Sequence, residues 1–155
     1  MTIGGKLIFL LIAMLLIGCA GISRTLISLD GSRTDDLTVV ALITEDQNFP
    51  VLLRGLDGMA VKSMRIPNPY GRYAYVMGAG KHVLWLKSAP YPHPLIPQRL
   101  YCYTMSAELH PGVSYYLKED VGKKQALLLR EDSGETVSTG ELVDEPWVFQ
   151  RDCRW

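Results

Sequence analysis

Three histidines, His82, His93 and His110, are the side chains in this 155-residue sequence best suited to acid–base chemistry or metal binding near neutral pH. No two of them show a His-x-His or His-x-x-x-His spacing, so the sequence lacks a pattern typical of a zinc site. It also lacks the Gly-x-Ser-x-Gly elbow that positions the nucleophile of many serine hydrolases. We therefore expect no metal, no cofactor and no catalytic residues.

A second segment with possible chemistry is Gly78-Ala79-Gly80-Lys81, because glycine followed by lysine occurs in phosphate-binding loops. Such a loop needs another glycine five residues before Gly80 and a serine or threonine after the lysine. This chain has Tyr75 and His82 at those positions. The segment is therefore expected to form a hairpin turn.

The stretch from residue 88 to residue 98 is the most distinctive part of the chain, because four prolines fall within eight residues. Closely spaced prolines favour a stiff, extended backbone, and a stiff loop loses little conformational entropy on binding. Two interpretations stay open. The stretch is either a connection between strands that the prolines stiffen, or a partner-binding loop that presents Tyr91, His93, Leu95 and Ile96.

The first 18 residues have the pattern of a secretory signal peptide. Lys6 precedes an uninterrupted run of 11 apolar residues, 7–17, and the small residue Gly18 follows. The run is shorter than the ~20 residues that a membrane-spanning helix needs. A buried core helix is the alternative, but this segment has no polar face.

The segment Leu16-Ile17-Gly18-Cys19 resembles the lipobox of bacterial lipoproteins. The resemblance implies that Cys19 carries a diacylglyceryl group, that residues 1–18 are removed, and that the new amino group is usually acylated with a fatty acid such as palmitate. Because Ala20 is not the aspartate typical of inner-membrane retention, the family pattern implies a periplasm-facing anchor in the outer membrane of a Gram-negative bacterium. The alternative is an ordinary secretory leader followed by a chance cysteine.

The other two cysteines, Cys102 and Cys153, would then lie in a compartment that permits disulfides. If Cys19 carries lipid, these two thiols form the only available pair. Their bridge would hold the tail 145–149 against the domain. The competing interpretation is one reactive thiol and one buried thiol.

The mature chain alternates short runs of β-branched and aromatic residues with turn signals. Residues 19–36 are polar and are expected to form a tether, although 25–29 could be a first strand, and the folded domain is expected at 37–155. This spacing predicts an all-β fold, a small antiparallel β-sandwich of about seven strands. A short helix at 117–129, interrupted by Gly122, is the local alternative. The expected strands are 37–43, 50–54, 59–64, 72–77, 82–87, 99–109, 113–118 and 125–130.

The turn signals, Asp57-Gly58, Gly80-Lys81-His82 and Pro111-Gly112, are similar in order to those of small bacterial envelope lipoproteins of uncharacterised function. The resemblance covers residues 37–130 and implies one transthyretin-like or immunoglobulin-like sandwich. It implies little about activity, because function resides in sites rather than in folds.

Basic and acidic residues balance at 16 each, and removal of Lys6 with the leader leaves 137 residues and a formal charge of −1. Without a basic stripe, nucleic acid is an improbable partner, and without a polybasic cluster, membrane attachment depends on the lipid. We expect a membrane-anchored lipoprotein that binds or scaffolds an envelope protein partner in the periplasm and is not an enzyme. The alternative is an immunity or inhibitor protein against a periplasmic toxin or lytic enzyme.

Overall fold

The computed structural model describes residues 25–32, 35–38, 40–45, 51–61, 73–89, 98–149 and 151–155. The expected signal peptide and Cys19 lie outside these residues, as do Tyr91, His93, Leu95 and Ile96 of the Pro-rich stretch. Every regular element within the described residues is a strand, which confirms the predicted all-β class. These residues contain no helix long and apolar enough to cross a membrane.

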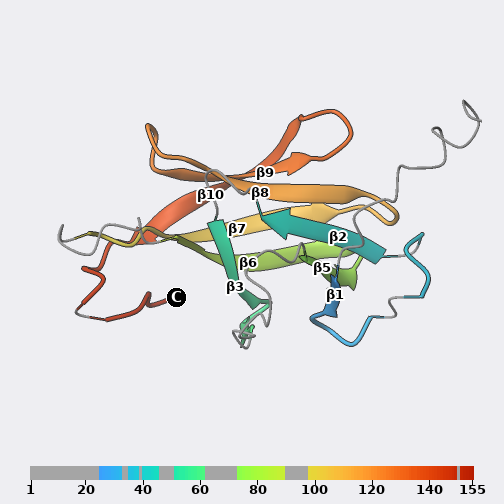
Figure 1. Ribbon diagram of the computed structural model, residues 1–155, viewed down its shortest axis with the longest axis horizontal. Helices are drawn as coiled ribbons and strands as arrows, with labels where there is room; N and C mark the ends of the chain where they lie inside the picture. Colours follow the sequence, from blue (N-terminus) through green and yellow to red (C-terminus); the bar gives the residue numbers. More distant parts are fainter. Residues whose placement is uncertain are drawn as a thin grey trace, which may run out of the picture.

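Within the described residues, ten strands form one curled sheet, a half-barrel, in the order β1-β5-β2-β8-β9-β10-β7-β6-β3-β4 (Figure 1). Strands β1 and β4 are therefore its two edges. The strands are β1 (Thr25–Ser28), β2 (Val40–Glu45), β3 (Val51–Leu56), β4 (Met59–Ala60), β5 (Tyr73–Gly78), β6 (Gly80–Ser88), β7 (Cys102–Leu109), β8 (Ser114–Asp120), β9 (Gln125–Arg130) and β10 (Thr136–Asp144).

The predicted sandwich of about seven antiparallel strands is wrong in strand number, in pairing and in architecture. The sheet is mixed, because β1 pairs with β5 and β2 pairs with β8 in parallel. Its two halves are continuous, because β10 pairs with β9 along one part of its length and with β7 along another. Strand β1 lies inside the stretch expected as a tether, so the sheet begins before residue 37.

Strand β10 has no counterpart among the predicted strands, since it lacks the alternation of apolar residues that marks a half-buried strand. Its only buried residue is Gly140. A Cβ atom at Gly140 would lie 3.3 Å from the Tyr103 side chain and 3.1 Å from that of Ala126. Side chains of the neighbouring strands β7 and β9 therefore fill the space beneath β10, whose own side chains are all at least partly exposed.

The predicted turns agree with the structure more closely than the predicted sandwich does. Asp57 and Gly58, at φ angles of 50° and 83°, connect β3 to β4, as an Asp-Gly hairpin requires. The alternative helix at 117–129 is wrong, because residues 121–124 form a turn between the antiparallel strands β8 and β9.

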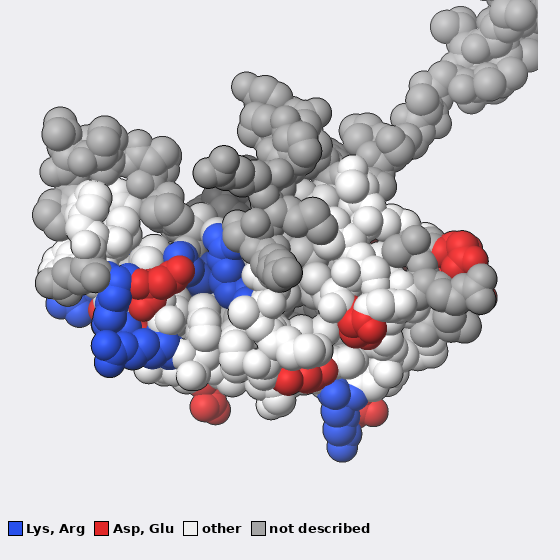
Figure 2. Space-filling view, turned by 90° about the horizontal axis from the view of Figure 1, so that it is seen from below, with Lys and Arg blue, Asp and Glu red and all other residues white. Residues whose placement is uncertain are grey.

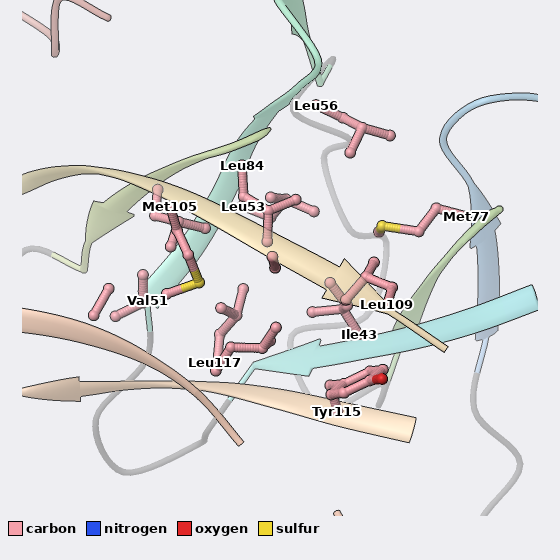
Figure 3. Packing of buried hydrophobic residues seen from close by; sticks show 14 of the residues in the cluster. Ile43, Val51, Leu53, Leu56, Met77, Leu84, Met105, Leu109, Tyr115 and Leu117 are labelled. Atoms are coloured by element: carbon pink, nitrogen blue, oxygen red, sulfur yellow. The ribbon is translucent and has the colours of Figure 1, made fainter. Parts of the chain in front are cut away.

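The hydrophobic core lies between the two halves of the curled sheet (Figure 3). Leu53, Leu84 and Met105 enter it from one half, and Ile43 and Leu117 enter it from the other. All five side chains are at most 1 % exposed. Burial of each such side chain contributes about 1.5–3 kcal/mol, so contacts across the core hold the curl together.

The chain after β10 runs back along the outside of the sheet and is fixed at several points. The predicted disulfide between Cys102 and Cys153 is present, with the two Cα atoms 5.7 Å apart. The Lys87 ammonium donates to Asp152 at 2.6 Å, and the Trp155 ring stacks on Trp85 with centroids 6.1 Å apart. We call residues 145–155 the strapped tail; Gln150 lies outside the described residues.

Candidate functional site

The histidines singled out in the sequence do not form a common site. The two ring nitrogens of His82 lie 2.7 Å from a carboxylate oxygen of Asp57 and 3.0 Å from the carbonyl oxygen of Gly78. Both nitrogens are thus occupied in holding two turns together. His110 is exposed and donates its backbone N–H to the Tyr115 hydroxyl at 2.9 Å. Within the described ranges, no group of three His, Cys, Asp or Glu side chains is placed to hold a metal ion.

The segment Gly78-Ala79-Gly80 forms the turn between β5 and β6, as predicted. The backbone N–H of Gly78 donates to the Asp30 carboxylate at 2.7 Å. A strand follows the turn, whereas a phosphate-binding loop leads into a helix whose N-terminus faces the phosphate. This segment is therefore a structural turn.

A cavity of about 540 Å³ lies where the half-barrel is open, between the β3–β4 hairpin and strands β1 and β5. This volume falls within the range of small-molecule sites. Both edge strands of the sheet contribute to its wall, so we call it the seam pocket. Its polar side chains are Glu45, Arg54, Tyr73 and Tyr75, with Ser28 at β1, and its apolar wall includes Ile27, Leu29, Leu52, Leu56, Met59 and Val61.

Glu45, the last residue of β2, is held in a single orientation. The backbone N–H of Leu53 donates to its Oε1 atom at 2.9 Å, and the Tyr73 hydroxyl donates to its Oε2 atom. The Tyr73 and Tyr75 rings pack edge to face with centroids 5.3 Å apart. Because β2 and β5 are antiparallel and pair Ile43 with Tyr75, the carboxyl and both phenols meet at the same end of the pocket.

The electrostatics of this group keep the phenols uncharged and raise the pKa of the carboxyl beside them. Burial raises the pKa of Glu45, although the hydrogen bonds from Tyr73 and Leu53 and the nearby positive charge of Arg54 oppose that shift. Burial and the Glu45 charge raise the pKa of Tyr75 to about 12, and burial together with the hydrogen bond to Glu45 also raises the pKa of Tyr73. The seam pocket therefore presents hydrogen-bonding groups of nearly balanced charge.

A second acid–tyrosine pair lies away from the pocket. The Tyr103 hydroxyl donates to Glu119 Oε1 at 2.8 Å, and burial raises the pKa of the Glu119 carboxyl. Tyr103 is fully buried, and its Cβ atom lies beside Gly140 of β10. This pair ties β7 to β8 through the core, so its role is structural.

The seam pocket was not found from the sequence, although part of its signal is present there. Tyr73 and Tyr75 alternate within a predicted strand, which places both on one face. Nothing local connects them to Glu45, which lies beyond the predicted end of its strand. Cys102 and Cys153 do not line the pocket.

The surface shown in Figure 2 carries both signs of charge, with Lys and Arg next to Asp and Glu at one end and isolated charges elsewhere. This face therefore presents no extended field of one sign. Ion pairs of the molecule include Arg151 with Asp144 and Lys124 with Glu145, the latter at 2.8 Å.

No protein-family model matches the sequence, no curated protein is significantly similar to it, and no solved structure matches it.

Proposed function

We propose that this chain is a lipid-anchored lipoprotein of the bacterial cell envelope and that its domain binds a ligand in the seam pocket. The anchor is argued from the lipobox-like segment ending at Cys19 and from the apolar leader before it. The observation that carries the binding role is a preorganised carboxyl and two phenols at one end of an otherwise apolar cavity. Pockets of this composition are typical of ligand sites.

The disulfide supports the proposed compartment. Disulfides persist in exported proteins and are rare in the reducing cytosol. The bridge joins a fully buried cysteine of β7 to the strapped tail, and the tail residues around it also form ion pairs with the sheet. A bridge embedded in folded structure in this way favours a structural role in an oxidising compartment over a role as a reactive thiol.

The distance between the proposed anchor and the pocket is limited by covalent geometry. Six residue steps separate Cys19 from Thr25, the first residue of β1. At 3.3–3.6 Å per residue, this segment spans at most ~20 Å. Since β1 forms one wall of the seam pocket, a lipid on Cys19 would keep the pocket close to the membrane surface.

The immunity or inhibitor role is a second candidate, favoured by a different feature. Phe149 is 79 % exposed in the strapped tail, next to Trp147, which lies under the guanidinium of Arg99 at 4.6 Å. Aromatic side chains are frequent energetic hot spots of protein interfaces. Capture of one lytic enzyme by the wild type and its loss with Phe149→Ser would favour this candidate over ligand binding in the pocket.

The anchor is tested by fractionation and intact-mass analysis of the chain expressed with its own leader. We expect the wild type in the membrane fraction, with a mass that includes diacylglyceryl on Cys19. The Cys19→Ala variant should lose that modification. An unmodified wild-type thiol, or a Cys19→Ala protein that still carries the lipid mass, would contradict the anchor.

A further inference from the structure

The charges and the position of the seam pocket also indicate what it binds. We propose that the seam pocket takes a single-chain amphiphile from the adjacent bilayer whose head is uncharged and carries hydroxyl groups, as in a monoacylglycerol. The inference rests on the proposed function, because it names the ligand class of the same pocket. The hydrocarbon chain would lie along the apolar wall, and the head would meet Glu45.

The apolar wall has surface that a chain would cover. Met59 in edge strand β4 is 60 % exposed, and Ala60 beside it is also exposed. Leu29 and Val61 border the same cavity while packing against the core beneath it. Removal of such apolar surface from water is favourable in proportion to its area, so a hydrocarbon chain fits this wall better than a polar ligand does.

The hydrogen-bonding capacity of Glu45 favours a head that donates. Its two oxygens accept from Leu53 N–H and from the Tyr73 hydroxyl, and the Tyr75 hydroxyl also interacts with the carboxyl. Because a carboxylate has about four lone-pair sites, one further donor can still be accommodated. Arg54 lines the same pocket, its positive charge acts on Glu45, and a guanidinium can only donate. A hydroxyl group serves both, because it donates to Glu45 and accepts from Arg54.

The same two residues disfavour a charged head. Glu45 and Arg54 carry opposite charges, so a carboxylate or phosphate head is repelled by Glu45 and an ammonium head is repelled by Arg54. Transfer of an ion out of water is also far more costly than transfer of a hydroxyl group that finds partners. The two charges together therefore favour a head group without charge.

The test uses the lipidated full-length mature protein in phosphatidylcholine nanodiscs. Three photoreactive probes share one diazirine-bearing alkyl chain and differ only in the head: a monoacylglycerol, a fatty acid and an alkylamine. After illumination and digestion, mass spectrometry measures labelling of the peptides that contain residues 25–32 and 51–61. We expect the monoacylglycerol to label these peptides about five- to tenfold more than either charged probe does. This ratio corresponds to a difference in binding free energy of ~1–1.4 kcal/mol, about that of one hydrogen bond.

Two variants separate the pocket from the rest of the surface. Ala60→Trp fills the pocket from its exposed edge and should reduce labelling to background. Val121→Trp, at a 52 % exposed position in the β8–β9 turn, is the matched control and should label as the wild type does. Unchanged circular dichroism shows that both variants fold.

Two further variants test the charge balance. Glu45→Gln removes the carboxylate from the pocket and leaves Asp152 of the strapped tail as the acidic group that faces Arg54, so labelling by the fatty acid should rise relative to the other two probes. Arg54→Gln leaves Glu45 unopposed, so the preferred probe should change to the alkylamine. A merely structural role for either residue would lower labelling by all three probes equally and would overturn the inference.

The outcomes distinguish the inference from the proposed function. If no probe gives labelling that Ala60→Trp removes, the pocket is not a binding site and the proposed function fails. If such labelling occurs but a charged probe equals or exceeds the monoacylglycerol in the wild type, the pocket binds ligands and only the head assignment is wrong.

Discussion

At the scale of single residues, Gly55 shows how closely the outer surface of the sheet is packed. The Trp85 ring lies directly on this glycine, and a Cβ atom there would be 2.2 Å from Trp85 Cε3. The other face of Trp85 carries the Trp155 ring. Gly55 is therefore the base of a stack that connects β3, β6 and the strapped tail.

We predict that Gly55→Ala destabilises the fold by about 1–3 kcal/mol, the usual cost of forcing extra volume into a packed site. The added methyl must displace Trp85, so tryptophan fluorescence should change together with the urea midpoint. Gly122→Ala is the control, because its Cβ would make an ordinary contact of 3.5 Å with Asp120 Oδ1. Equal stability of the two variants would contradict this account.

The sequence predicted the disulfide but not the residues of the seam pocket. Cys102 and Cys153 were paired by counting thiols, which needs no knowledge of the fold. Glu45 acquires its role only when Tyr73 and Leu53 approach it, and its hydrogen bonds to them come from two other strands. Sequence patterns report the periodicity of one element and not the convergence of three.

At the scale of elements, the strapped tail is a segment without regular secondary structure that is held in place by side chains. The Arg151 guanidinium bonds both carboxylate oxygens of Asp144, one of them at 2.8 Å, and Lys87 binds Asp152. Each pair has one exposed partner, Asp152 or Arg151, so water screens it and it stabilises little on its own. The covalent bridge is therefore the main constraint on the tail.

We predict that Cys153→Ala lowers the free energy of unfolding by up to ~4 kcal/mol, because the bridge closes a loop of about 50 residues in the unfolded chain. Cys153 is the better position to change, since Cys102 is fully buried and its truncation would also leave a cavity. The measurement is guanidinium unfolding with and without reductant. Reductant should lower the wild-type midpoint toward that of the variant and leave the variant unchanged; an unaffected wild type would refute the prediction.

Elements bounded by strong turn residues were predicted from sequence, and those defined by distant partners were not. The predicted strand 125–130 coincides with β9, and Asp57-Gly58 forms the predicted turn, although β3 extends to Leu56, two residues beyond the predicted end. Strand β10 was missed because Gly140 leaves it without an apolar signal. The parallel pairing of β2 with β8 was missed because Leu42 lies opposite Ser114, far along the chain, and no local rule specifies such a pair.

At the scale of the whole molecule, the carboxyl groups whose pKa values change on folding set how stability depends on pH. Burial raises the folded-state pKa of Glu45 and of Glu119 above the ordinary glutamate value of 4.5. Between the unfolded and folded pKa values, the folded state then binds more protons than the unfolded state. The contribution of these groups is fully present below the unfolded pKa and is lost as pH rises through the folded pKa.

We therefore predict that Glu45→Gln reduces the loss of stability as pH rises above about 4.5, because the variant has one fewer group of this kind. Urea unfolding at a series of pH values measures the effect. Asp36→Asn is the control with the opposite sign, because hydrogen bonds from Thr38 lower the pKa of Asp36 and its contribution is lost as pH falls. A Glu45→Gln protein with the same pH dependence as the wild type would contradict the prediction.

The two parallel pairings, β1 with β5 and β2 with β8, have a consequence for how quickly the molecule assembles. Each requires segments that leave the ribosome far apart in time to meet before either gains from the contact. Chains dominated by such distant pairings fold in milliseconds to seconds rather than microseconds. During that interval the strands at both edges of the half-barrel expose unpaired backbone, so the nascent protein should depend on holding chaperones more than a helical domain of equal length does.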